Sequence, residues 1–241
     1  MSKKPLLHTV LSPALLNLYD IENSIVVIID VFRATSTIAT ALYNGAVQVI
    51  PVDNVETCIE LGRKEGCITA GERDGKVVEG LQYGNSPSEY HRDFIEGKTL
   101  VITTTNGTRL LHMALNMGAA EVITGSFVNL SSVCAHLVKQ NRNVILGCSG
   151  WKNRFNLEDT LLAGAVVECI ESAFTVHCDS SLMAKELFGL HRNDLYTFIR
   201  KTTHWHRLAA YGAERDLEYC VTKDSADVLP VYNGHALVAG I

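Results

Sequence analysis

The chain has 241 residues, 47% of them hydrophobic and 20% charged, which suits one large α/β domain or two small ones. Its formal net charge of −5 argues against a nucleic-acid-binding protein, because phosphate backbones require a basic surface. The seven cysteines contain no Cys-x-x-Cys pair, and no apolar run is long enough for a signal sequence or a membrane span. We therefore expect a cytoplasmic protein with a small-molecule partner and no membrane contact.

Short β-branched segments alternate with segments of helical length. We expect strands at residues 25–29, 47–52, 100–103, 122–124 and 144–146, and helices at 35–43, 55–64, 108–117, 130–139 and 157–172. This alternation predicts an α/β fold with three layers, α/β/α, around a mainly parallel sheet, formed by residues 1–241 as one unit. The segments after about residue 175 are predicted to be mostly helical and rich in surface residues, and no role is assigned to them.

One stretch of sequence recurs 73 positions later, which aligns Thr35 with Thr108 and Gly45 with Gly118. Both copies read as strand, turn, helix, Gly-Ala and strand. An internal βαβ duplication explains the match, and so does the apolar period that any two βαβ units share, with a glycine after each helix. Two similar halves would meet near residues 95–100.

The first predicted strand ends in polar groups. Asp30 follows five apolar residues and precedes Arg33, Thr35 and Ser36. Ligands of open α/β sheets bind at the carboxyl ends of strands, where helix N-termini are positive. Asp30 is therefore a candidate metal ligand with a catalytic role, and Arg33 is a candidate catalytic cation. The hydroxyls of Thr35 and Ser36 are candidate substrate ligands. An Asp at the junction of a strand and a helix is also a common helix cap. A haloacid-dehalogenase mechanism would need a second Asp where this chain has Phe32.

Two turns further along the chain add candidates. Residues 71–75 carry Glu72, a candidate catalytic and metal-binding carboxylate, and Arg73, a candidate substrate ligand, although a plain charged turn explains them almost as well. Asn85 and Ser86 precede Pro87 in a turn that can present an amide, a hydroxyl and backbone donors to a phosphate.

The strand predicted at 100–103 leads into a second polar segment. Thr104, Asn106, Gly107 and Arg109 supply a hydroxyl, an amide, a flexible glycine and a guanidinium at the start of a helix. Such groups can hold an oxyanion, so we take all four as candidate substrate ligands. Single Thr or Asn residues at this place are more often helix caps.

The strand predicted at 144–146 raises the question of a cysteine nucleophile. Cys148 and Arg154 have the spacing of phosphatases in which a thiolate attacks phosphorus and an arginine holds the phosphate. However, Gly147 stands where those enzymes have histidine, and cysteine at a strand end is often a buried apolar residue. We favour Cys148 and Arg154 as substrate-binding residues without a thiolate mechanism.

The residues that follow Cys148 offer backbone donors and carboxylates. Ser149 and Gly150 are candidate substrate ligands. Glu158 and Asp159 begin a predicted helix, where they are candidate metal ligands, Asp159 with a catalytic role, although acidic residues there also complement the helix dipole.

His204 and His206 flank Trp205 near the end of the chain. Residues two apart on a helix point in different directions, so the pair is a poor metal site. Surface or packing roles are predicted for both histidines.

Five blocks occur in order between about residues 25 and 165: IDVFRATST, GERDG, YGNSP, TTTNGTR and RFNLED. Together they resemble the 2-phosphosulfolactate phosphatase family, magnesium-dependent enzymes of the coenzyme M and sulfolactate pathway. The resemblance implies Mg²⁺ as cofactor and hydrolysis of (2R)-2-phospho-3-sulfolactate to sulfolactate and phosphate.

The implied substrate carries a phosphate, a carboxylate and a sulfonate. Six cationic side chains come from the predicted strand-end loops of this acidic chain: Arg33, Arg73, Lys76, Arg109, Lys152 and Arg154. Three alternatives stay open, namely a phosphatase for a related small phosphoacid, a thiolate phosphatase that uses Cys148 and Arg154, and a non-catalytic anion-sensing module. The sequence also leaves a homodimer open.

Overall fold

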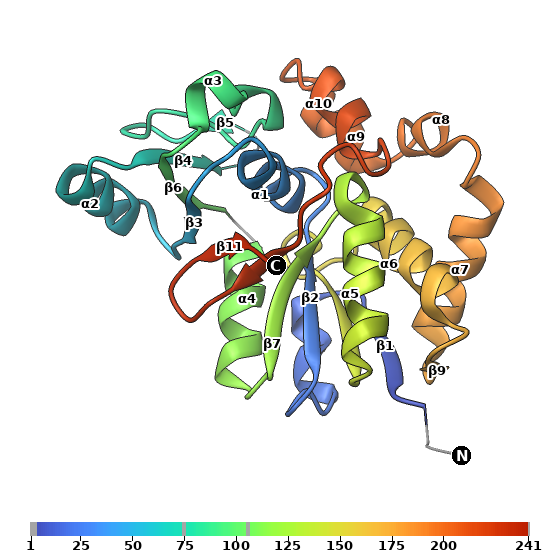
Figure 1. The fold of residues 1–241 in the computed structure, drawn as a ribbon. Coiled ribbons are helices and arrows are strands. Elements are labelled where there is room, and N and C mark those ends of the chain that lie inside the picture. The colour runs from blue at the N-terminus through green and yellow to red at the C-terminus, as the bar shows by residue number, and fades with distance from the viewer. Residues whose placement is uncertain (1–3, 74–75, 105–106, 241) are drawn as a thin grey trace.

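The computed structural model describes residues 4–73, 76–104 and 107–240 (Figure 1). Its strands are β1 Leu6–Val10, β2 Ile25–Ile29, β3 Gln48–Pro51, β4 Ile68–Arg73, β5 Lys76–Val77, β6 Thr99–Thr103, β7 Glu121–Gly125, β8 Val144–Cys148, β9 Thr175–Val176, β10 Pro230–Tyr232 and β11 Leu237–Ala239. Its α-helices are α1 Ala34–Tyr43, α2 Val55–Glu65, α3 Arg92–Ile95, α4 Gly107–Asn116, α5 Leu130–Gln140, α6 Leu157–Ile170, α7 Asp179–His191, α8 Leu195–Ile199, α9 Thr203–Ala209 and α10 Glu214–Cys220. Short 3-10 helices are η1 Pro13–Leu18, η2 Pro87–Glu89 and η3 Phe127–Asn129.

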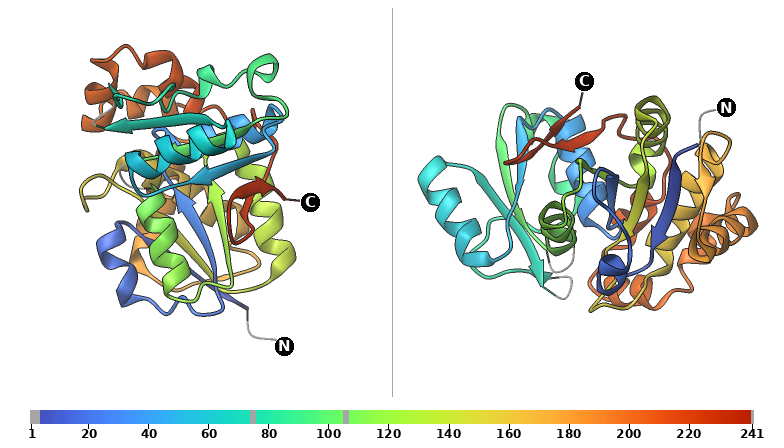
Figure 2. Two further views of the ribbon diagram at one scale, coloured as in Figure 1. Left: turned by 90° about the vertical axis from the view of Figure 1, so that its left-hand side faces the viewer. Right: turned by 90° about the horizontal axis from the view of Figure 1, so that it is seen from below.

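The described strands form an 11-stranded sheet in the order β5-β4-β6-β3-β11-β10-β7-β2-β8-β1-β9. Most neighbours run parallel, which confirms the predicted mainly parallel sheet. The antiparallel exceptions are the β4–β5 pair and the C-terminal hairpin β10–β11, which pairs with β7 on one side and with β3 on the other. Figure 2 shows the hairpin, in red, between two groups of strands.

All five predicted strands and all five predicted helices are present, and their ends differ from the prediction by at most two residues. The local signals act as expected. Asn54 caps α2, because its side-chain oxygen accepts a 2.7 Å hydrogen bond from the Thr57 amide. Gly66 ends the same helix in the left-handed region, with φ of 65°.

The side chains of β2 enter two cores on opposite faces of the sheet. Ile25, Val27 and Ile29 pack in a cluster with residues of α5 and α6, whereas Val26 and Ile28 pack in a cluster with residues of α1 and α4. This alternation follows from the two-residue period of a strand. Helices therefore cover both faces at β2, as the predicted α/β/α arrangement requires.

The two copies of the repeated sequence form matching elements. A shift of 73 places α1 on α4 at both ends, and β3 on the start of β7. In space the copies cross, because β3 of the first lies beside β6 of the second, and β7 of the second lies beside β2 of the first. A boundary near residues 95–100 thus separates two repeating segments of sequence but not two sheets.

Helices α8, α9 and α10 lie together beyond the carboxyl ends of β2 and β7 (Figure 1). The last third of the chain therefore covers the edge of the sheet where ligands of such folds bind. None of the described helices is long and apolar enough to cross a membrane.

Candidate active site

The loop between β2 and α1 fixes the position of Asp30. The Asp30 amide donates to Thr35 Oγ1 (3.2 Å), and the Thr35 amide donates to the Asp30 carbonyl (3.0 Å). The Ser36 hydroxyl donates to the Val31 carbonyl (3.0 Å). The Thr35 and Ser36 hydroxyls are both buried and bond to the backbone of this loop, so they stabilise the position of Asp30. The sequence had predicted them as substrate ligands.

Asp30 is buried among acidic groups. Burial and then the negative charges of Glu72 and Glu158 raise the pKa of its carboxyl from 3.8 to about 6, while His204 and the Ser149 hydroxyl act in the opposite direction. A carboxylate in this environment is stabilised by any cation that binds beside it.

The first turn of α4 lies against this carboxylate. A Cβ atom at Gly107 would lie 3.2 Å from Asp30 Oδ2 and 3.5 Å from Thr104 Oγ1. Thr104 accepts a 3.4 Å hydrogen bond from the Thr108 amide and so caps the helix. The helix N-terminus, with its positive dipole end, is therefore next to Asp30. Asn106 falls outside the described residues.

Asp159 connects two of the strand-end loops. Its Oδ1 accepts a hydrogen bond from the Val31 amide (2.9 Å), and its Oδ2 accepts one from the Gly150 amide (3.0 Å). Burial, Glu158 and Asp30 raise the pKa of this carboxyl well above its usual range. Each oxygen thus accepts a hydrogen bond from a backbone amide, which is typical of a structural carboxylate, and the metal-binding and catalytic roles of Asp159 stay predictions.

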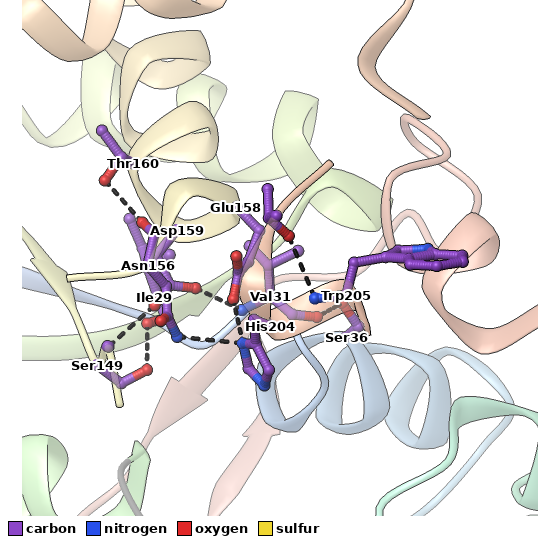
Figure 3. A network of polar contacts seen from close by, with 12 residues as sticks. Ile29, Val31, Ser36, Ser149, Asn156, Glu158, Asp159, Thr160, His204 and Trp205 are labelled. Atoms are coloured by element: carbon purple, nitrogen blue, oxygen red, sulfur yellow. Dashed lines mark hydrogen bonds and ion pairs between the residues drawn. The ribbon is translucent and has the colours of Figure 1, made fainter. Parts of the chain in front are cut away.

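Glu158, the neighbour of Asp159, forms an ion pair with His204 of α9 (Figure 3). The Glu158 side chain is 1% exposed and that of His204 is 11% exposed. The amide nitrogen of Asn156 lies 3.2 Å from the same His204 Nδ1, and the ring of Phe32 meets the His204 ring edge-on at 5.8 Å. His204 therefore has three neighbours, two at Nδ1 and one against its ring.

A cleft of about 220 Å³ lies between the β2–α1 loop and α10, and Arg33, Glu72, Asn85, Ser86 and Asp216 contribute to its lining. The buried Arg33 guanidinium donates to Asp216 of α10. Asn85 is also buried, and its Oδ1 has no hydrogen-bond partner within the described part of the chain. This oxygen is available to a ligand.

The remaining predicted arginines lie in less enclosed places. Arg73 donates to Thr103 Oγ1 (3.2 Å). Arg109 is exposed and donates to Asn153 Oδ1 (3.1 Å), and Arg154 is exposed in the turn after β8. These three residues are better placed to attract or orient an anion than to enclose it.

The chain is similar to known proteins over most of its length. Residues 10–235 match the family model described as 2-phosphosulpholactate phosphatase. A protein of Thermotoga maritima is 41% identical over 215 residues, which cover 89% of each chain. A protein of Caldanaerobacter subterraneus subsp. tengcongensis is 38% identical over 215 residues and 88% of each chain, and one of Clostridium novyi is 33% identical over 88% of this chain and 91% of its own. Each is named "probable 2-phosphosulfolactate phosphatase".

The chain belongs to the 2-phosphosulfolactate phosphatase family. The resemblance carried by the five sequence blocks is thereby confirmed. The match extends through α9 and α10 to residue 235, so the family also includes the C-terminal region that carries His204 and Asp216.

In this family member, Cys148 does not have the environment of a nucleophile. Its side chain is fully buried in the core that contains Ile29 and Leu161. Burial and then the charges of Asp159 and Glu158 raise the pKa of its thiol well above the usual range. A thiol in this state forms little thiolate and is out of reach of a substrate. The structure therefore disfavours both the thiolate alternative and a substrate contact by this side chain.

The acidic groups fit a magnesium ion that relies on few protein ligands. Within the described ranges, no three His, Cys, Asp or Glu side chains converge as a metal-binding set. Magnesium often takes only one or two carboxylates and completes its coordination with water and phosphate oxygens. Glu158 and Asp159 are engaged elsewhere, so Asp30 fits best as the principal ligand, and Glu72 is the carboxylate with the largest electrostatic effect on it.

Sequence reasoning missed His204 and Asp216. Both belong to the C-terminal helices, and their spacing in the sequence carries no motif. His204 was assigned a surface or packing role, but it pairs with the buried Glu158, whereas His206 is exposed as expected. No sequence signal could have found the pair, because only the fold brings the buried Glu158 and the distant His204 together.

Proposed function

We propose that this chain is a Mg²⁺-dependent phosphatase that hydrolyses (2R)-2-phospho-3-sulfolactate to 3-sulfolactate and inorganic phosphate in the cytoplasm. Support for the substrate comes from relatives named as 2-phosphosulfolactate phosphatases, which cover most of this chain. The free state of all seven cysteines fits a reducing compartment.

The observation that carries the proposal is the environment of Asp30. Its carboxylate lies beside the N-terminus of α4, and burial, followed by the neighbouring carboxylates, raises its pKa to about 6. Burial of several acidic groups at the carboxyl end of a parallel sheet is costly unless a cation compensates them. A site for a divalent cation and a phosphate accounts for this cost.

The chain's own residues would divide the work as follows. Asp30, with Glu72 nearby, would hold Mg²⁺, which supplies charge neutralisation on the phosphate oxygens when it is bound. The N-terminus of α4, next to Asp30, would bind and orient the substrate phosphate. Arg109 and Arg154, which are exposed after the ends of β6 and β8, would attract its carboxylate and sulfonate groups.

The experiment is phosphate release from (2R)-2-phospho-3-sulfolactate, measured with EDTA and again after Mg²⁺ is restored. Chelation should abolish turnover and Mg²⁺ should recover it. Asp30→Asn should reduce kcat/KM by about a hundredfold to a thousandfold, as loss of a positioned electrostatic group does. Asp20→Asn, an exposed control, should match the wild type. Full activity in EDTA would refute the magnesium part of the proposal.

A related phosphoacid is the second candidate substrate, because Arg109 and Arg154 are not specific to a sulfonate. Phosphosulfolactate, 2-phospholactate and glycerol phosphate would therefore be compared. One charge-assisted hydrogen bond contributes about 1.5–3 kcal/mol, so loss of two anionic contacts should lower kcat/KM by roughly a hundredfold to ten-thousandfold. Equal efficiency on all three esters would remove the requirement for a second anion.

A further inference from the structure

The pair formed by His204 and Glu158 joins two elements that are far apart in the chain. Glu158 lies in the first turn of α6 and His204 in the first turn of α9, and their contact is through Nδ1 of the imidazole ring and Oε1 of the carboxylate. Figure 3 shows the two side chains facing each other next to Asp159. The structure therefore builds a carboxylate–histidine pair at the same edge of the sheet as Asp30.

The contact determines which ring nitrogen is left for chemistry. A carboxylate oxygen accepts hydrogen bonds, so Nδ1 of His204 must carry the proton that it shares with Glu158. This fixes the tautomer and the ring orientation, as carboxylate–histidine pairs do in general. The Asn156 amide nitrogen is assigned 3.2 Å from Nδ1, and with a proton on Nδ1 this amide would present its oxygen to the ring instead. Nε2 remains as the nitrogen that can exchange a proton.

Glu158 depends on His204 for its partner. Glu158 is 1% exposed, and its Oε2 has no hydrogen-bond partner among the residues that the structure describes. The pairing of its Oε1 with the His204 ring is what compensates the burial of this carboxyl group.

The histidine also lies beside the loop that carries Asp30. Its ring meets the ring of Phe32 edge-on at 5.8 Å, and its charge acts on the Asp30 carboxyl. Helix α9 thus brings a histidine to the carboxyl end of β2, and none of the five sequence blocks contains one.

We propose that His204 is the general acid that protonates the leaving alcohol, and that Glu158 is the positioning residue that holds it; this rests on the proposed phosphatase function. Water attacks phosphorus and the bond from phosphorus to the ester oxygen breaks. The leaving oxygen takes the Nε2 proton and departs as the alcohol. The proton that the attacking water loses ends on phosphate or in solvent, and the imidazole regains a proton from solvent.

A phosphate monoester needs such an acid when its alcohol is a poor leaving group. In the loose transition state of phosphoryl transfer, the bond to the leaving oxygen is largely broken and negative charge collects on that oxygen. Positioned acids contribute about a hundredfold to ten-thousandfold. An ester of a more acidic alcohol gains little from protonation, which gives a readout that a purely structural histidine would not affect.

The test compares 2-phospholactate with its 3,3,3-trifluoro analogue, whose alcohol is more acidic, alongside phosphosulfolactate. His204→Gln should lower kcat/KM about a hundredfold to ten-thousandfold on the unfluorinated esters, and less than about tenfold on the trifluoro ester. His206→Gln, two residues away on the exposed side of the same helix, should match the wild type on every ester. Glu158→Gln keeps an acceptor but loses the charge, and should show the same leaving-group pattern with a smaller loss.

Chemical rescue gives a second, independent measurement on the substrate itself. Imidazole added to His204→Ala should restore part of the turnover of phosphosulfolactate, and it should restore none in Asp30→Asn. Equal losses on all esters together with no rescue by imidazole, or a fully active His204→Gln, would overturn the assignment of His204 alone. A wild-type protein that releases phosphate from none of the esters would overturn the proposed function, and the assignment with it.

Discussion

Asp159 Oδ1 accepts a 2.9 Å hydrogen bond from the Val31 amide, which joins the start of α6 to the loop after β2. The second oxygen of the same carboxylate serves the Gly150 amide after β8. Because β2 and β8 are neighbours in the sheet, one side chain fixes both strand-end loops. The arrangement of the candidate site therefore depends on a residue that is engaged entirely with the backbone.

Asp159→Ala should destabilise the protein markedly. The substitution leaves two buried N–H groups without partners, and each costs about 1–3 kcal/mol. Relief of repulsion with Glu158 and Asp30 offsets part of this loss. Urea unfolding measures the difference. Glu168→Ala on the same helix removes only a partly exposed ion pair with Arg192 and should cost about 0–1 kcal/mol. Equal stability of the two variants would contradict the structural role of Asp159.

The raised pKa of Asp30 predicts how stability depends on pH in metal-free protein. The carboxyl has a pKa of 3.8 as its ordinary value and about 6 in the fold, so between these values the native state binds more protons than the unfolded state. The contribution of Asp30 to the free energy of unfolding is fully present below about pH 4. It is lost as the pH rises through about 6, a change of about 3 kcal/mol.

Urea unfolding of wild type and Asp30→Asn in EDTA, between about pH 4 and pH 7, isolates this contribution. The advantage of the wild type over the variant should shrink as pH rises. Asp159, whose pKa is also raised, should leave a residual slope of the same sign in the variant. A constant difference between the two proteins across this range would show that Asp30 titrates normally.

Gly107→Ala should separate activity from stability. Alanine is favoured over glycine in a helix by up to about 1 kcal/mol, but its Cβ would lie 3.2 Å from Asp30 Oδ2 and displace the carboxylate. We expect an unchanged or higher Tm and a fall in kcat/KM of about tenfold or more, since small displacements in a positioned site are costly. Gly189→Ala in α7 is the control, because its Cβ would meet mainly the flexible Arg192 side chain. Wild-type activity in Gly107→Ala would place Asp30 outside the reaction.

Cys148→Ala should retain activity within about threefold, because a side chain buried in the core takes no part in nucleophilic attack. In native protein, iodoacetamide should label the exposed Cys169 and leave Cys148 unmodified. Mass spectrometry of tryptic peptides measures the labelling. A loss of several orders of magnitude in a folded Cys148→Ala protein would reinstate the thiolate mechanism.

Much of the fold could be predicted because its signals are local. The five apolar residues of β2 and the cap at Asn54 act within a few residues of chain, and the helices and strands they define have the expected bounds. The hairpin β10–β11 was missed although it carried a signal, since Asn233 and Gly234 form a typical turn sequence between its strands. Its insertion in the middle of the sheet is a tertiary property that no short pattern contains.

The candidate site was less predictable for the same physical reason. The sequence located the strand ends, but it did not reveal that Glu72 of β4 acts on Asp30 after β2, because five strands stand between β4 and β2 in the sheet. It did not reveal how each polar group is satisfied. Asp159 bonds to backbone amides, and the expected hydroxyl ligand Ser36 bonds to a carbonyl. Such pairings depend on which loops meet in space.

The position of the C-terminal hairpin has a consequence for how the protein is made. The strands β5, β4, β6 and β3 on one side, and β7, β2, β8, β1 and β9 on the other, are joined through β10 and β11, which are synthesised after all of these strands. Until then β3 and β7 each present an open edge with unpaired backbone groups, which other chains can pair with. A nascent or truncated chain that lacks residues 230–239 should therefore be the species most exposed to aggregation, and the one that most needs a chaperone.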